Sequence, residues 1–174
     1  MPNTALPASP VGPHDSLVAP TLRRRLAAML YEGLLLFGVM FGATAIFLLL
    51  RAIVPPLART GDIGLQVWGF FALGLYFVGF WRKRGQTLAM QTWRMRVVNA
   101  DGSRISLGRA VVRYALAWIW VAVAVGIIHV SGVSRWAGAG VALACVLAWG
   151  ALAWLDPQRQ FLHDRLAGTR LVRD

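Results

Sequence analysis

Cysteine is almost absent from this sequence, and charged residues are scarce. Cys145 is the only cysteine among 174 residues, which excludes an internal disulfide and a cysteine-based metal cluster. It lies within an apolar run, where a small packing residue is a better interpretation than a reactive thiol. Asp, Glu, Lys and Arg make up 14% of the chain, so the charges must gather in a few polar segments instead of coating a surface.

The sequence also lacks the patterns that usually carry catalysis. It contains no Gly-rich phosphate loop, no nucleophile elbow and no paired-carboxylate hydrolase site. His163 and Asp164 are adjacent, but neighbouring residues on a helix point about 100° apart and do not converge on one metal ion. We therefore expect no enzymatic activity, no metal and no other cofactor.

Long apolar runs are the dominant feature of the chain. Hydrophobic residues make up 57% of the sequence, and the mean hydropathy is +0.58, which is too apolar for an ordinary soluble domain of this size. A helix that crosses the hydrocarbon core of a membrane needs about 20 residues. Four runs are long enough, at residues 27–50, 63–80, 111–130 and 136–155. The sequence therefore predicts an all-α membrane protein with four transmembrane helices.

The basic residues indicate the orientation of these helices. Fifteen of the eighteen Lys and Arg lie in the segment before the first span, in the connection between the second and third spans through Arg113, or in the C-terminal tail. The positive-inside rule places these segments, and so both ends of the chain, in the cytoplasm. The isoelectric point of 11.6 then reflects cations that face anionic lipid at the inner membrane, and nucleic acid is not an expected partner.

Sequence patterns also predict the structure of the segments outside the spans. Residues 1–20 hold five of the eight prolines and almost no charge, so we expect a disordered tail over residues 1–21 before a membrane domain over residues 22–174. Arginines followed by a long apolar run are typical of an uncleaved start-transfer helix. In the middle connection, Asp101-Gly102 favours a hairpin over residues 95–105, and residues 87–93 fit a short amphipathic helix.

Glu32 is the only acidic residue within the four expected spans. Such a group costs on the order of 2.5 to 3.5 kcal/mol near the bilayer centre, so it requires a partner or a proton. Arg25 lies two turns earlier, but both side chains lean toward the start of the helix, and the rise of roughly 10 Å argues against a direct pair. The alternative partners are Asp164 or Asp156 for Arg25, and Arg113, Arg109 or His163 for Glu32.

Three linked motifs follow one another along the chain: RLAAMLYE at residues 25–32, GQTLAM followed by RMRVV over residues 85–98, and LHDRLAGT at residues 162–169. Together they resemble the RDD family of small bacterial membrane proteins. The family is named for one Arg and two Asp, which the resemblance places on Arg25, Glu32 and Asp164. Glu32 departs from the pattern, keeping the charge and adding one methylene. The resemblance implies the inner membrane of a bacterial cell and a part in transport, with ion or proton antiport as one form of it.

Two functional hypotheses follow. In the first, the chain is a membrane assembly module that binds lipid or a partner protein without enzymatic activity. Arg25, Glu32 and Asp164 then lock the cytoplasmic ends of the helices, and the basic middle connection docks anionic lipid or a membrane protein. In the second, the chain is a small transporter or antiport component, in which Glu32 gains and loses a proton. Four helices are few for a pore, so a transporter would act as a homo-oligomer.

Overall fold

The computed structural model describes residues 19–152 and 160–173, and most of this part of the chain is helical. The longer helices are α1 (Leu22–Ile53), α3 (Gly61–Arg84), α5 (Leu107–Ala117), α6 (Ile119–Ser131) and α7 (Arg135–Ala151). The short elements are α2 (Pro55–Ala58), α4 (Leu88–Thr92), β1 (Met95–Asn99), α8 (Leu162–Leu166) and β2 (Thr169–Arg173). The tail expected over residues 1–21 lies mostly outside the described residues.

In the described part of the chain, three helical segments are long and apolar enough to cross a membrane. They are Arg23–Ile53, Gly61–Arg84 and Leu107–Ser131, the last formed by α5 and α6 together, and they contain the first three expected spans. The fourth expected span corresponds to α7, a shorter apolar helix of 17 residues. At 1.5 Å per residue α7 is about 26 Å long, and the end of the span, residues 153–155, lies outside the described part.

The outer faces of these helices are apolar. Leu30 and Phe37 of α1 and Leu75 of α3 are each about three-quarters exposed. Patches of this kind are rare on monomeric soluble proteins, whereas lipid tails are as apolar as leucine and solvate such a surface without cost. The helices therefore have the surface that a membrane-embedded protein requires.

A two-stranded antiparallel sheet corrects the all-α expectation. β1 pairs with β2, with Met95 opposite Arg173 and Asn99 opposite Thr169. The hairpin expected over residues 95–105 is reduced to one bridge between Val98 and Arg104, and the short helix expected before it is present as α4. The main partner of β1 comes from the far end of the chain, so its pairing depends on tertiary proximity and not on a local turn.

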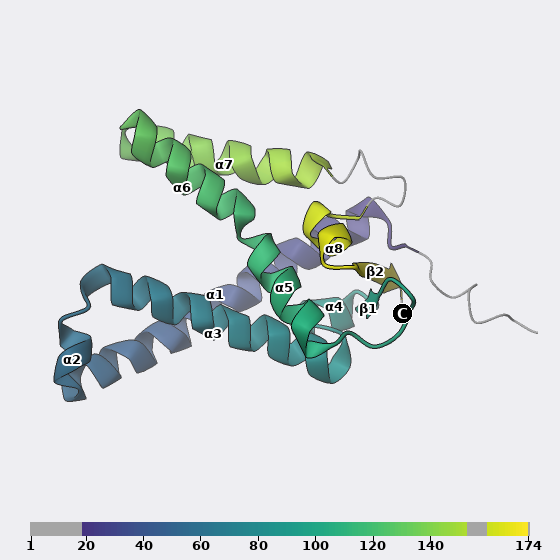
Figure 1. Cartoon of the computed structure of the whole chain (residues 1–174), viewed down its shortest axis with the longest axis horizontal. Helices are drawn as coiled ribbons and strands as arrows, with labels where there is room; N and C mark the ends of the chain where they lie inside the picture. The colour runs from purple at the N-terminus through teal and green to yellow at the C-terminus, as the bar shows by residue number, and fades with distance from the viewer. Residues whose placement is uncertain (1–18, 153–159, 174) are drawn as a thin grey trace, which may run out of the picture.

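Most of the buried apolar side chains lie at one end of the long helices. We call the four short elements α4, β1, α8 and β2 the cap, and Figure 1 shows them gathered at the end opposite α2. Met95 and Val97 of β1 and Leu171 of β2 form a cluster with Ala28 of α1 and Trp81 of α3. The cap therefore packs against the start of α1 and the end of α3.

Candidate functional site

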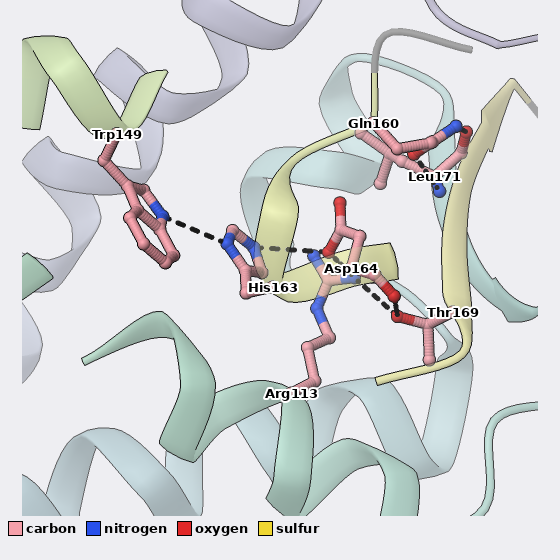
Figure 2. A network of polar contacts seen from close by, with 7 residues as sticks. All are labelled: Arg113, Trp149, Gln160, His163, Asp164, Thr169 and Leu171. Carbon is pink, nitrogen blue, oxygen red and sulfur yellow. Dashed lines mark hydrogen bonds and ion pairs between the residues drawn. The ribbon is translucent and has the colours of Figure 1, made fainter. Parts of the chain in front are cut away.

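Arg113 of α5 and Asp164 of α8 form a buried ion pair between α5 and the cap (Figure 2). Nη1 of Arg113 lies 2.5 Å from Oδ1 of Asp164, and the side chains are 5% and 0% exposed. The guanidinium also stands 4.6 Å from the ring centroid of Trp81, within the range of a cation–π contact. Buried charges are tolerated in proteins when they have such partners.

His163 extends this pair toward α7. Its Nε2 lies 3.2 Å from Oδ1 of Asp164, and its Nδ1 accepts a hydrogen bond of 3.4 Å from Nε1 of Trp149, as Figure 2 shows. An accepting Nδ1 leaves the proton of a neutral imidazole on Nε2, directed at the carboxylate. The ring also stacks on Phe161, with an interplanar angle of 6°. Trp149 and His163 therefore connect α7 to the buried carboxylate.

Arg25 belongs to the same charged region. Its side chain is buried at the start of α1, and Nε donates to the carbonyl of Pro20 at 3.2 Å. Burial alone would raise the pKa of Asp164, but the positive charge of Arg113, the contact with His163 and the positive charge of Arg25 outweigh it and hold that pKa below its ordinary value of 3.8. Asp164 is therefore a carboxylate at neutral pH. Asp156, the other acid considered for Arg25, lies outside the described residues.

Glu32 has hydroxyl partners instead of a base. Tyr76 of α3 donates from Oη to Oε1 of Glu32 at 2.6 Å, and Thr87 donates from Oγ1 to Oε2. Thr87 also caps α4 by accepting from the backbone N–H of Met90. Two charge-assisted hydrogen bonds stabilise a carboxylate that is only 9% exposed. The contact joins α1, α3 and the cap at one side chain.

The expectation that a base pairs with Glu32 is therefore wrong for the described residues. Arg113 and His163 contact Asp164, and Arg109 donates to the carbonyl of Gly168 at 3.3 Å. The sequence reasoning missed Tyr76 and Thr87. A signal for Tyr76 was present, because a phenol inside an apolar span needs a hydrogen-bond acceptor, and Glu32 was the only carboxylate in the expected spans.

A small cavity brings the two parts of the site together. It has a volume of about 120 Å³ and is bordered by Arg25, Glu32, Arg113 and His163, together with apolar side chains from α1, α4 and the sheet. Four of the residues singled out in the sequence thus face one space. Within the described ranges, no group of three His, Cys, Asp or Glu side chains is placed to hold a metal ion.

Comparison with protein families identifies the group to which this site belongs. The model of the RDD family matches residues 19–168, a range that contains Arg25, Glu32 and Asp164. The chain belongs to the RDD family. Family membership and the apolar helices together make this RDD chain an integral, multi-pass membrane protein. No curated protein and no solved structure matches it.

Proposed function

We propose that this RDD protein is a non-enzymatic module of the bacterial inner membrane that locks its cytoplasmic helix ends with the cap and binds anionic lipid there. The buried pair of Arg113 and Asp164 is the observation that carries the proposal. A carboxylate that is completely buried and ion-paired holds α8 against α5, and it is closed to a substrate. The family carboxylate thus has a structural task in this proposal.

Polar contacts within the cap support the same role. Leu171 of β2 donates its N–H to Oε1 of Gln160 at 3.0 Å, and Nε2 of Gln160 donates to the carbonyl of Leu171 at 3.3 Å (Figure 2). Oγ1 of Thr169 donates to the carbonyl of Asp164 at 3.1 Å. These bonds tie β2 to the segment that carries Asp164. The cap can then act as one unit that clamps the helices.

The proposed topology has four spans with both ends in the cytoplasm. The start of α1 and the strand β2 both lie at the cap end of the helices (Figure 1). A chain that starts and finishes on one side crosses the membrane an even number of times. Three segments of the described residues are long enough to cross, so we assign the fourth crossing to α7, and the distribution of Lys and Arg favours a cytoplasmic cap.

A second candidate function is cation transport through Glu32. The observation in its favour is the cavity that Glu32 shares with Arg25 and His163, because a titratable carboxylate beside a small space near a membrane is typical of proton pathways. The hydroxyls of Tyr76 and Thr87 would then release the carboxylate when it takes up a proton.

One experiment separates the two functions. Wild type and Glu32→Gln are reconstituted in liposomes, and proton and sodium fluxes are followed with dyes sensitive to each ion. The proposed module gives no flux above empty liposomes in either sample. A flux in wild type that Glu32→Gln abolishes would reject the module and support transport. A second copy or a membrane protein that co-purifies at fixed stoichiometry would support the assembly role.

A further inference from the structure

Two hollows adjoin at the cap end of α3. The first is a groove of about 740 Å³ between α1, α3 and α4, bordered mainly by apolar side chains such as Val39, Phe80 and Leu88. The second is a pocket of about 240 Å³ between the end of α3 and the loop that follows β1. Lys83 and Arg84 border both hollows. The apolar groove and the pocket therefore meet at two cations.

The pocket has the charge of an anion site. Its border includes Arg82, Lys83, Arg84, Arg96 and Arg104, and none of the described residues on this border is acidic. Asp101 lies in the neighbouring loop, where its carboxylate accepts from the backbone N–H and the hydroxyl of Ser103. Guanidinium and ammonium groups are the donors that proteins use for phosphate. A phosphate group matches the charge of this pocket, and the pocket is large enough to hold one.

The groove has the character of an acyl-chain site. Leu75 on its border is 79% exposed and lies within a segment long enough to cross a membrane. The groove thus opens toward the hydrocarbon, and Lys83 and Arg84 stand at the end of that segment, where headgroups lie. A soluble anion would satisfy only the pocket, and an uncharged lipid only the groove.

We propose that one anionic phospholipid occupies both hollows, with an acyl chain in the groove and its phosphate at Lys83 and Arg84. The inference rests on the proposed function, since it names the place where the module holds anionic lipid. Tyr76 borders the groove and donates to Glu32. The acyl chain therefore packs beside the residue that orients the family carboxylate, so bound lipid stabilises that contact.

Glycine positions give a clean test of the groove. A Cβ at Gly79 meets no atom within 4 Å, and Gly79 borders the groove, so Gly79→Leu adds an apolar side chain that competes with an acyl chain for the groove. Gly126 on α6 also has open space and lies outside both hollows, so Gly126→Leu is the matched control. For the charges, Lys83→Gln with Arg84→Gln is compared with Arg59→Gln and Arg135→Gln, which remove two exposed cations elsewhere.

The measurement is native mass spectrometry of the full chain released from micelles with phosphatidylglycerol or phosphatidylcholine of identical acyl chains. We expect wild type to retain one phosphatidylglycerol about tenfold more often than phosphatidylcholine. Gly79→Leu and the Lys83, Arg84 double variant should each lose most of this retention, while both controls keep it. Added inorganic phosphate should not displace the lipid, because it cannot fill the groove. Unfolding temperatures near that of wild type verify that each variant is folded.

The results of this experiment distinguish a failure of the proposed lipid site from a failure of the proposed lipid-binding function. If wild type prefers the anionic lipid and both site variants retain it like their controls, the site is overturned and the lipid-binding role stands. If wild type shows no preference between the two lipids, both the site and the lipid-binding role are wrong. The flux experiment then still tests whether the protein is a non-transporting module whose cap holds the helix ends together. If inorganic phosphate displaces the bound phosphatidylglycerol, the ligand of the pocket is a soluble anion and the proposed lipid site is wrong.

Discussion

Arg113 and Asp164 lie 2.5 Å apart at their nearest polar atoms, although one belongs to α5 and the other to α8. A buried ion pair contributes little net stability, since the loss of hydration offsets the attraction. Removing one partner is much more costly, because the other charge stays buried without compensation. The pair therefore holds the C-terminal segment against the helices, and its contribution to stability requires both residues.

Asp164→Asn should destabilise the protein by about 3 to 5 kcal/mol, because it leaves the buried cation of Arg113 without its carboxylate. Thermal unfolding in detergent measures the change. Asp62→Asn, an exposed carboxylate on α3, is the control and should stay within about 0.5 kcal/mol of wild type. The double variant Arg113→Met with Asp164→Leu should recover much of the loss. An Asp164→Asn protein as stable as wild type would contradict the role of the pair.

Acid should weaken the cap through Asp164. Its pKa in the folded protein lies below the ordinary value of 3.8, so the unfolded chain binds this proton more readily than the folded one. The stabilisation is complete above about pH 5 and is lost as the pH falls through 3.8 toward the lower folded pKa. The unfolding temperature of wild type should therefore fall more steeply between about pH 5 and pH 3 than that of Asp164→Asn. Parallel profiles would show that another group governs acid sensitivity.

The hydroxyl partners of Glu32 should each matter to stability. Tyr76→Phe and Thr87→Val each remove one donor from a buried carboxylate, with an expected loss of about 1 to 2 kcal/mol. Thr87→Ser keeps a hydroxyl and should lose less. Tyr31→Phe, on an exposed position of α1, controls for the loss of a phenol and should change little. Equal unfolding temperatures for Tyr76→Phe and Tyr31→Phe would show that the contact to Glu32 contributes nothing.

Two helix-ending glycines allow a matched comparison. Gly85 ends α3 and Gly132 ends α6, with left-handed φ angles of 70° and 57°. An alanine Cβ at Gly85 would lie 3.2 Å from the carbonyl oxygen of Val97 in β1, whereas one at Gly132 meets no atom within 4 Å. Both substitutions carry left-handed strain of about 1 to 2 kcal/mol, and Gly85→Ala should cost about 1 kcal/mol more by crowding the cap. Equal losses of stability for Gly85→Ala and Gly132→Ala in thermal unfolding would show that the contact with the carbonyl oxygen of Val97 adds no cost.

Reporter fusions test the topology. A reporter placed after Arg59 should be periplasmic, and one placed after Asp101 should be cytoplasmic, because the cations gather on the cytoplasmic side. A reporter at the C-terminus should also be cytoplasmic if α7 crosses the membrane. A reversed result for the first two would overturn the orientation, and a periplasmic C-terminus would leave three spans.

Local sequence was enough to locate the first three spans, the helix α4 and the family residues. Hydrophobicity over about 20 residues and the positions of Lys and Arg are properties of short segments, and the bilayer acts on them directly. The family motifs likewise placed Arg25, Glu32 and Asp164 without any knowledge of their contacts.

The partners of those residues depended on how distant segments meet. The contact of Asp164 with Arg113, that of Glu32 with Tyr76 and Thr87, and the pairing of β1 with β2 all join parts of the chain far apart in sequence. A charge attracts any opposite charge, so chemistry alone left several partners open for Arg25 and for Glu32. Packing of the cap against α1, α3 and α5 decides the partners, because only side chains brought into hydrogen-bond distance can compensate a buried charge. For Glu32 these partners are two hydroxyls and none of the expected bases.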